Sequence, residues 1–189
     1  MNGRMPNKLV ELIPEYARVC SVNGAVYGLH PAETLFGRTY HAHMIPPFVP
    51  DHTLMLGYGC GTVAELMRKV WGKSLKITGV DIERRDWDYC EHRFVKMDAY
   101  DFVRECSDGM IKKRFDYIAV DLYNGKEVPS FVYETEFAVR LKEICRKMIS
   151  FNIPDVEFRK MRSFYDYGFI FDRAVVVDAQ CVNWWTVNS

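Results

Sequence analysis

The sequence predicts an α/β fold with a mostly parallel, seven-stranded sheet, helices on both faces and an antiparallel edge strand. Three observations predict it. Short apolar strands alternate with helical segments from residue 51 onward, as in parallel sheets. A glycine-rich segment follows the first of these strands. The last two apolar segments are separated by only a short turn, so we expect them to pair antiparallel.

Composition and charge set limits on the class of protein. The 189 residues suit one domain, and 49% hydrophobic with 26% charged residues is ordinary for a globular protein. The formal net charge is zero and no basic stripe is visible, so charge gives no clear nucleic-acid signal. No secretory signal or membrane-length apolar segment is visible, which favours a cytoplasmic protein without membrane contact.

The six cysteines stand singly, without a C-x-x-C pair. We therefore expect free thiols and no metal. His41 and His43 share the two-residue spacing of one strand face, but no nearby cysteine or carboxylate cluster completes a metal site.

Residues 1–50 are expected to form a short N-terminal extension, and residues 51–189 the main domain. A β-hairpin is predicted over Val19–Val26, turning at Asn23-Gly24, because this dipeptide favours the tight turns of hairpins. Prolines at positions 46, 47 and 50 separate the extension from the domain.

The first half of the domain reads as strand, helix, strand, strand. Thr53–Leu56 is a short apolar strand that ends at a glycine. Val63–Trp71 has apolar residues at helical spacing along one face. Leu75–Val80 and Phe94–Met97 are the second and third strands.

The second half continues the alternation. The strand with the strongest pattern in the chain is FDYIAVDL, at Phe115–Leu122, and Pro129 and Ser130 suit the start of a long helix. The expected helices are Tyr100–Cys106, Phe131–Met148 and Val156–Tyr165, and the remaining strands are Ile149–Ile153, Phe169–Val177 and Val182–Val187, the last two joined by a turn at Asp178–Gln180.

The glycine-rich segment is Gly57-Tyr58-Gly59-Cys60-Gly61, between a strand and a helix. Glycines let the backbone approach a ligand closely, and the helix that follows offers unpaired N–H groups. A tight turn without any ligand is an equally good explanation of this motif taken alone.

A second signal is Asp81, which ends its strand twenty residues after Gly61. A carboxylate at this place can accept hydrogen bonds from both hydroxyls of a ribose, whereas the alternative is a solvated helix cap. Loop and carboxylate together favour a nucleoside. The third glycine of the G-x-G-x-x-G dinucleotide fingerprint comes one position early, which disfavours NAD.

Several motifs in order resemble class I S-adenosylmethionine-dependent methyltransferases, which have a Rossmann-like fold, and especially their spermidine-synthase-like branch. The resemblance covers roughly residues 36–150. The segments that carry it are LMLGYGCGTVAELM, GVDIE, FVKMDAYDFV, FDYIAVDLYNGKEVPSFVYETEF and TYHAHMIPPF.

The resemblance implies S-adenosylmethionine as cofactor, with S-adenosylhomocysteine as product. The glycine loop would admit the amino-acid end, Asp81 would hold the ribose, and Asp121 would lie near the sulfonium. The cofactor-binding residues it implies are Gly57, Tyr58, Gly59, Gly61, Asp81, Ile82 and the Asp98-Ala99 pair at the adenine, Asp121, and Tyr40 as a cover.

Two departures from the branch bear on the reaction. Asn124 stands where the branch carries the second Asp of a D-x-x-D pair, and Ala42 stands in place of a Glu. A polyamine must lose a proton to a carboxylate before it can attack, and an amide cannot take that proton. Methyl transfer depends more on positioning, so Asp121, Tyr123 and Asn124 are expected to orient an acceptor.

We therefore predict a methyltransferase that acts on an unknown, small-molecule acceptor. Two alternatives stay open. One is an aminopropyltransferase with an altered site, and the other is a non-catalytic module that keeps the fold for binding or assembly. The sequence leaves open whether the chain forms a homodimer.

Overall fold

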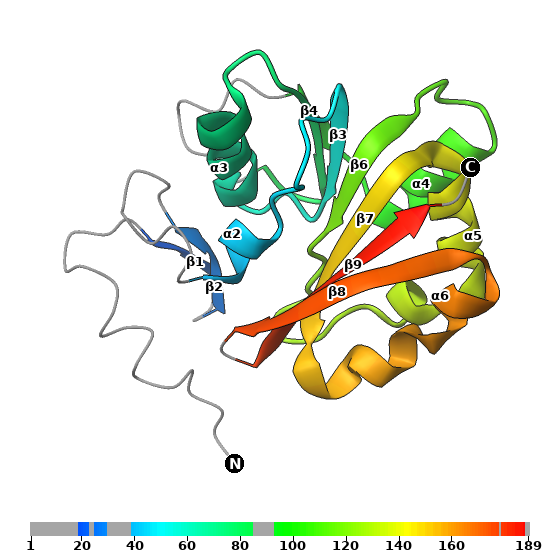
Figure 1. Cartoon of the computed structure of the whole chain (residues 1–189). Coiled ribbons are helices and arrows are strands. Elements are labelled where there is room, and N and C mark those ends of the chain that lie inside the picture. Colours follow the sequence, from blue (N-terminus) through cyan, green and yellow to red (C-terminus); the bar gives the residue numbers. More distant parts are fainter. Residues whose placement is uncertain (1–18, 23–24, 30–38, 85–92, 178, 188–189) are drawn as a thin grey trace.

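The computed structural model describes residues 19–22, 25–29, 39–84, 93–177 and 179–187, and their main feature is a seven-stranded sheet (Figure 1). The strand order is β5-β4-β3-β6-β7-β9-β8. The first five are parallel neighbours, and β9 pairs antiparallel with both β7 and β8. The bounds are β3 (His52–Leu56), β4 (Lys76–Asp81), β5 (Arg93–Lys96), β6 (Phe115–Val120), β7 (Cys145–Pro154), β8 (Phe169–Val177) and β9 (Gln180–Val187). The predicted fold class is confirmed.

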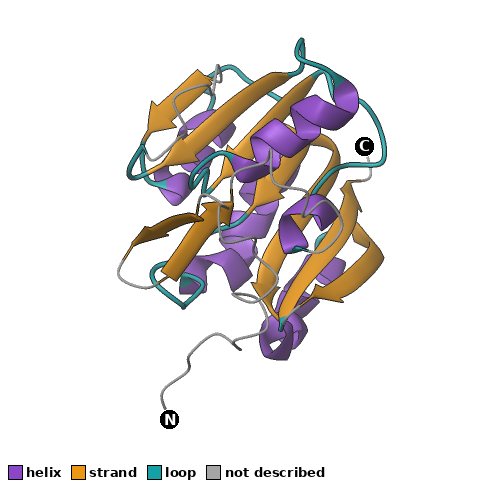
Figure 2. Cartoon of the chain, turned by 90° about the vertical axis from the view of Figure 1, so that its left-hand side faces the viewer, coloured by secondary structure: helices purple, strands orange, loops and turns teal. Residues whose placement is uncertain are grey.

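Helices lie on both sides of this sheet (Figures 1 and 2). Successive residues of β3 face opposite sides: Leu54 and Leu56 belong to one buried cluster and Met55 to another. The first cluster includes α4 and α5, and the second includes α3. The helical bounds are α2 (Tyr40–His43), α3 (Thr62–Trp71), α4 (Ala99–Ser107), η1 (Ser130–Tyr133), α5 (Thr135–Ile144), η2 (Asp155–Arg162) and α6 (Ser163–Asp166).

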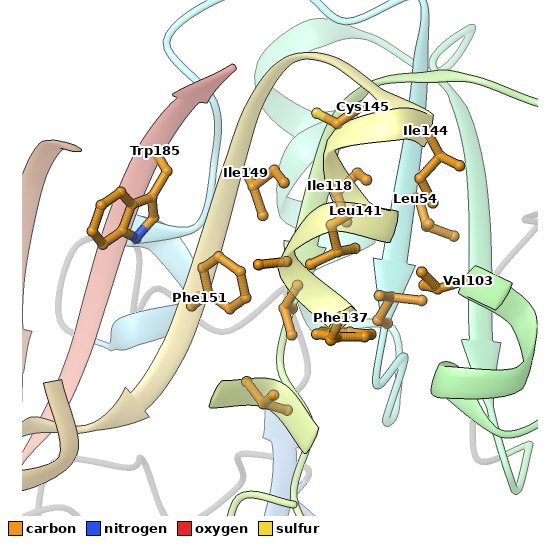
Figure 3. Close-up of a cluster of buried hydrophobic side chains, with 14 of the residues drawn as sticks. Leu54, Val103, Ile118, Phe137, Leu141, Ile144, Cys145, Ile149, Phe151 and Trp185 are labelled. Carbon is orange, nitrogen blue, oxygen red and sulfur yellow. The ribbon is translucent and has the colours of Figure 1, made fainter. Parts of the chain in front are cut away.

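The larger core holds the strand ends in place. Phe137 and Leu141 of α5 pack toward Ile118 of β6 and Ile149 of β7 (Figure 3). All four side chains are fully buried. Burying a side chain of this size contributes roughly 1.5–3 kcal/mol, so the cluster anchors the central strands whose ends form the site described below.

The long helix predicted over Phe131–Met148 is wrong at both ends. The chain forms the short η1 first, then α5, and Cys145 already begins β7. The amphipathic pattern continues to Met148, but Cys145 pairs with Phe115 and Met148 with Tyr117 of β6. Pairing with a central strand overrides a local helical pattern. The predicted helix over Val156–Tyr165 is replaced by η2 and a four-residue α6.

One hairpin precedes the sheet in sequence, and a second one forms the last two strands of the sheet itself. β1 (Val19–Val22) and β2 (Ala25–Leu29) pair antiparallel, while their predicted Asn23-Gly24 turn lies outside the described residues. At the other end, β8 and β9 form the predicted antiparallel pair. The backbone N–H of Asp155 donates to the carbonyl of Ala179 at 3.0 Å, which ties the tip of this hairpin to the end of β7.

The expectation of free thiols is wrong at Cys60, which is disulfide-bonded. Cys106, Cys145 and Cys181 are free and buried. In the described part of the chain, every helix is too short or too polar to cross a membrane.

Candidate functional site

The candidate site lies at the carboxyl edge of the sheet, beside the point where the strand order reverses. From β3 the chain adds β4 and β5 on one side and then β6 and β7 on the other. Ligands of open α/β sheets bind beyond the carboxyl ends of the strands at such a switch point. The glycine loop follows β3, Asp81 ends β4, and Asp121 follows β6, so the topology brings these predicted residues to one edge.

The glycine loop needs glycines for two physical reasons. Gly57, Gly59 and Gly61 all have positive φ angles, of 79°, 54° and 77°. A side chain on Gly57 would in addition place its Cβ 2.0 Å from the backbone carbonyl oxygen of Asp121. The loop therefore packs directly against the end of β6, and Gly61 leads into α3.

Tyr58 of this loop points into the protein. It is 3% exposed and packs against Gly79 of β4, where an added Cβ would lie 2.2 Å from the Tyr58 ring. Its ring meets Phe94 edge-on with centroids 5.8 Å apart. The Tyr58 side chain thus fixes the loop on the sheet.

Asp81 is joined to the glycine loop. Its Oδ2 accepts a hydrogen bond from the Gly59 N–H at 2.9 Å, and its Oδ1 accepts one from the Glu83 N–H at 3.3 Å. No described helix begins at Asp81, so the alternative of a helix cap does not apply to the described chain. Ile82, directly after it, is 63% exposed and offers an apolar surface beside the carboxylate.

Asp98 is the N-cap of α4. Its Oδ1 accepts from the Tyr100 N–H at 2.8 Å and from the Asp101 N–H at 3.3 Å. The Met97 N–H donates to the Asp81 carbonyl at 3.0 Å, which places Asp98 beside the end of β4. The Ala99 methyl group is buried in the larger core.

Asp121 is the centre of a hydrogen-bonded cluster. Asn152 of β7 donates from Nδ2 to its Oδ1 at 2.8 Å, and Tyr40 of α2 donates from its hydroxyl to Oδ2 at 3.2 Å. Burial raises the pKa of Asp121 to about 6, although both hydrogen bonds act in the opposite direction. A carboxyl with this pKa changes its charge near neutral pH.

The neighbours of this cluster are themselves buried. The Tyr40 ring stacks on His41 with centroids 3.9 Å apart. Burial lowers the pKa of His41 to about 4, so its imidazole is neutral at physiological pH. Within the described residues, His41 Nε2 and Asn152 Oδ1 are buried polar atoms without a hydrogen-bond partner, and such atoms are suited to meet a ligand.

The predicted acceptor residues are not all brought together. Tyr123 donates from its hydroxyl to Gln180 Oε1 at 2.5 Å, at the start of β9. Asn124 instead lies in a tight turn, where its N–H donates to the Glu127 carbonyl at 2.8 Å, and its side chain is exposed. The structure thus joins Tyr40, Asp121 and Tyr123 at one edge and places Asn124 in the loop outside this set of contacts.

Sequence reasoning missed Asn152, His41 and Gln180 as site residues. Asn152 carried a usable signal, because it interrupts the apolar segment Phe151–Ile153 of a central strand. A buried polar side chain in such a strand needs a partner, and this partner is Asp121. Gln180 has no comparable signal, because its contact with Tyr123 depends on how the closing hairpin folds back.

The chemical character of the edge is uneven. At one end it offers backbone N–H groups of a glycine loop, an anchored carboxylate at Asp81 and the exposed apolar Ile82. At the other end lies the partly buried Asp121 carboxyl. The edge therefore offers hydrogen-bond donors, two carboxylates and an apolar surface within one site.

Comparison with solved structures defines the class of fold. No protein-family model and no curated protein sequence matches the chain. A candidate S-adenosylmethionine-dependent methyltransferase from Streptococcus mutans superposes with a TM-score of 0.62 at 15% identity, over 90% of this chain and 55% of that one. The chain therefore spans about 55% of that protein's length.

Two further structures agree. Aeropyrum pernix fibrillarin, solved with natively bound S-adenosylmethionine, gives a TM-score of 0.58 at 16% identity, over 92% of this chain and 85% of that one. The ribosomal protein L11 methylase from Lactobacillus delbrueckii gives a TM-score of 0.53 at 13% identity, over 73% of this chain and 70% of that one. The fold is that of class I S-adenosylmethionine-dependent methyltransferases.

Proposed function

We propose that this chain binds S-adenosylmethionine and transfers its methyl group to an acceptor. The observation that carries the proposal is the hydrogen bond from the Gly59 N–H to Asp81, which joins the carboxylate to the glycine loop at the switch point of a methyltransferase fold. A ribose-binding carboxylate must be held in place beside the loop that receives the rest of the nucleoside, and the Gly59 N–H holds it there.

The residues present fit this cofactor. The backbone of Asp121 occupies the space that a Cβ atom on Gly57 would need, so only glycine can form the loop at this position. Ile82 is exposed beside Asp81, where the adenine would lie, and Asp98 stands at the next strand end. When bound, S-adenosylmethionine supplies an activated methyl group on a cationic sulfur.

Asp121 has the main electrostatic role. Ionised, it stabilises a nearby positive charge in a poorly hydrated place, where Coulomb attraction is stronger than in water. Asn152 and Tyr40 fix both of its oxygens, so the carboxylate does not have to reorganise. Tyr123, held by Gln180, stands on the same loop and can position the acceptor.

The resemblance over residues 36–150 favours the spermidine-synthase-like branch as the origin of this site. The residues of the site nevertheless suit methyl transfer better than aminopropyl transfer. Aminopropyl transfer requires a carboxylate as base for the amine. Asn124 is an amide and lies in an exposed turn. We therefore expect that the protein makes no spermidine from putrescine and decarboxylated S-adenosylmethionine. If it makes spermidine at an enzyme-like rate, its function is aminopropyl transfer and not methyl transfer.

The test is transfer of label from S-adenosylmethionine labelled in its methyl group. Purified protein is incubated with fractionated small-molecule and macromolecular extracts, and enzyme-dependent incorporation is expected in one fraction. Asp81→Ala should lower it strongly when the cofactor concentration is below the Kd of the variant, whereas Lys69→Ala, an exposed change on α3, should not. If cofactor binds but no fraction is labelled, the chain is a non-catalytic binding module.

A further inference from the structure

Basic residues gather at the amino end of the sheet, on the opposite edge from the candidate site. Five neighbouring parallel strands begin there; four of them begin at or beside a lysine or arginine, and the fifth begins at His52. β5 begins at Arg93, β4 at Lys76 and β3 at His52; β6 begins directly after Arg114, and Arg146 is the second residue of β7. Neighbouring strands lie about 4.8 Å apart, so the row is roughly 19 Å long. We call this row the basic edge.

The basic edge ends in a cavity of about 490 Å³. Lys112, Lys113, Arg114 and Arg146 contribute to its wall, together with one carboxylate, Glu143. Lys112, Arg114 and Arg146 are exposed. Sequence alone shows only the Lys112–Arg114 run, because Arg146 arrives from a strand more than thirty residues later.

The buried carboxylate at this edge does not neutralise it. Asp116 is 2% exposed and accepts a hydrogen bond from the Asp51 N–H at 2.8 Å. Arg146 and Lys147 share it at 3.7 and 3.6 Å, and both cationic side chains remain half exposed. Asp51 adds an exposed second carboxylate beside these two cations, so the excess of positive charge at this edge comes from Lys112, Lys113, Arg114, Lys76 and Arg93.

The cations from separate segments also act on one another. Lys113, Lys76 and Arg93 all lower the pKa of His52, after the larger effect of burial. Arg93 likewise lowers the pKa of Lys113. The cations of three different strand starts therefore lie near one another around His52, and a bound anion would relieve the repulsion between Arg93 and Lys113.

We propose that the basic edge binds the phosphodiester backbone of a single-stranded nucleic acid. A row of roughly 19 Å is too long for one phosphate and suits a chain of them. A flexible strand can follow the row of strand ends into the cavity, where Lys112, Arg114 and Arg146 would meet its phosphates. This inference does not rest on the proposed methyl transfer, because it concerns the opposite edge of the sheet.

The test is fluorescence anisotropy of the full chain with labelled oligouridylate and oligothymidylate of about 12 nucleotides. Each phosphate contact contributes about −0.7 to the slope of log K against log salt for single strands. The variant Lys112→Ala, Arg114→Ala, Arg146→Ala should bind at least about tenfold more weakly near 100 mM salt, with a slope flatter by about 2.

A matched control removes the same charge elsewhere. Lys69, Lys96 and Arg159 are exposed outside the basic edge, and their triple alanine variant should bind within about twofold of wild type. Urea unfolding verifies that both variants are folded; if the first is not, Arg114→Ala alone should still flatten the slope by about 0.7. Equal weakening by both triples, absence of binding, or tighter binding to tripolyphosphate or anionic vesicles would overturn the proposal.

Discussion

At the scale of single residues, Asp121 makes the cofactor's charge measurable. S-adenosylmethionine and S-adenosylhomocysteine differ by one methyl group and by the positive charge on sulfur. The pKa of Asp121 is about 6, so the carboxyl is largely neutral near pH 5 and ionised near pH 7.5. Only the ionised form attracts the sulfonium. The preference for S-adenosylmethionine over S-adenosylhomocysteine should therefore increase several-fold as the pH rises from about 5 to about 7.5.

Titration calorimetry with both nucleosides at the two pH values measures this preference. Asp121→Asn is the control, because an amide has no charge to gain, and its preference should not vary with pH. A wild-type preference that is independent of pH, or that falls as pH rises, would place the sulfur away from Asp121.

Asp121 also affects folding stability. Burial raises its pKa in the folded protein from 3.8 to about 6, so between about pH 4 and 6 the folded state binds more protons than the unfolded chain. Stability is therefore lost as pH rises through this window, by at most about 1.4 kcal/mol per pH unit. Relative to Asp121→Asn, wild type should be more stable at about pH 4.5 than at about pH 7. Urea unfolding of both proteins checks this, and a difference that is constant with pH would show that Asp121 is not buried.

At the scale of elements, the close contact between the glycine loop and β6 has an energetic effect that can be measured separately from the strain of a positive φ angle. Gly57 and Gly109 share a φ of +79°, but a Cβ on Gly57 would lie 2.0 Å from the Asp121 carbonyl, whereas nothing lies within 4 Å at Gly109. Gly109→Ala should cost about 1–2 kcal/mol, the conformational strain alone. Gly57→Ala should cost roughly 2 kcal/mol more, because backbone must move. Equal losses in urea unfolding would mean that the loop and β6 are not in contact.

The same scale shows what sequence can and cannot predict. The central strand Phe115–Val120 was predictable because its apolar segment is buried throughout. The helix over Val63–Trp71 was predictable because Val63, Leu66 and Met67 form one buried face, although Val70 is 40% exposed. Cys145–Met148 was not, because its helical pattern competes with pairing to β6, a contact about thirty residues away in sequence. At the site, Asp81 and the glycines follow from spacing along the chain. The bonds of Tyr40 and Asn152 to Asp121 depend on packing between distant segments.

At the scale of the whole molecule, the sheet separates two proposed sites. The nucleoside site lies at the carboxyl ends of the strands and the basic edge at their amino ends. No described side chain is assigned to both, so the two ligands should bind independently. Saturating oligouridylate should leave the Kd for S-adenosylhomocysteine unchanged within about twofold. Direct competition would mean that the nucleic acid occupies the carboxyl edge instead.

The proposed contact between Asp81, which the Gly59 N–H holds in place, and the ribose of an S-adenosyl nucleoside has a direct test. The test is titration calorimetry of S-adenosylhomocysteine with wild type and Asp81→Ala. Loss of two charge-assisted hydrogen bonds should cost about 2–4 kcal/mol, which is roughly 30- to 900-fold in Kd. NAD should bind neither protein measurably. Equal affinity of wild type and Asp81→Ala for S-adenosylhomocysteine, or tighter binding of NAD, would contradict the account.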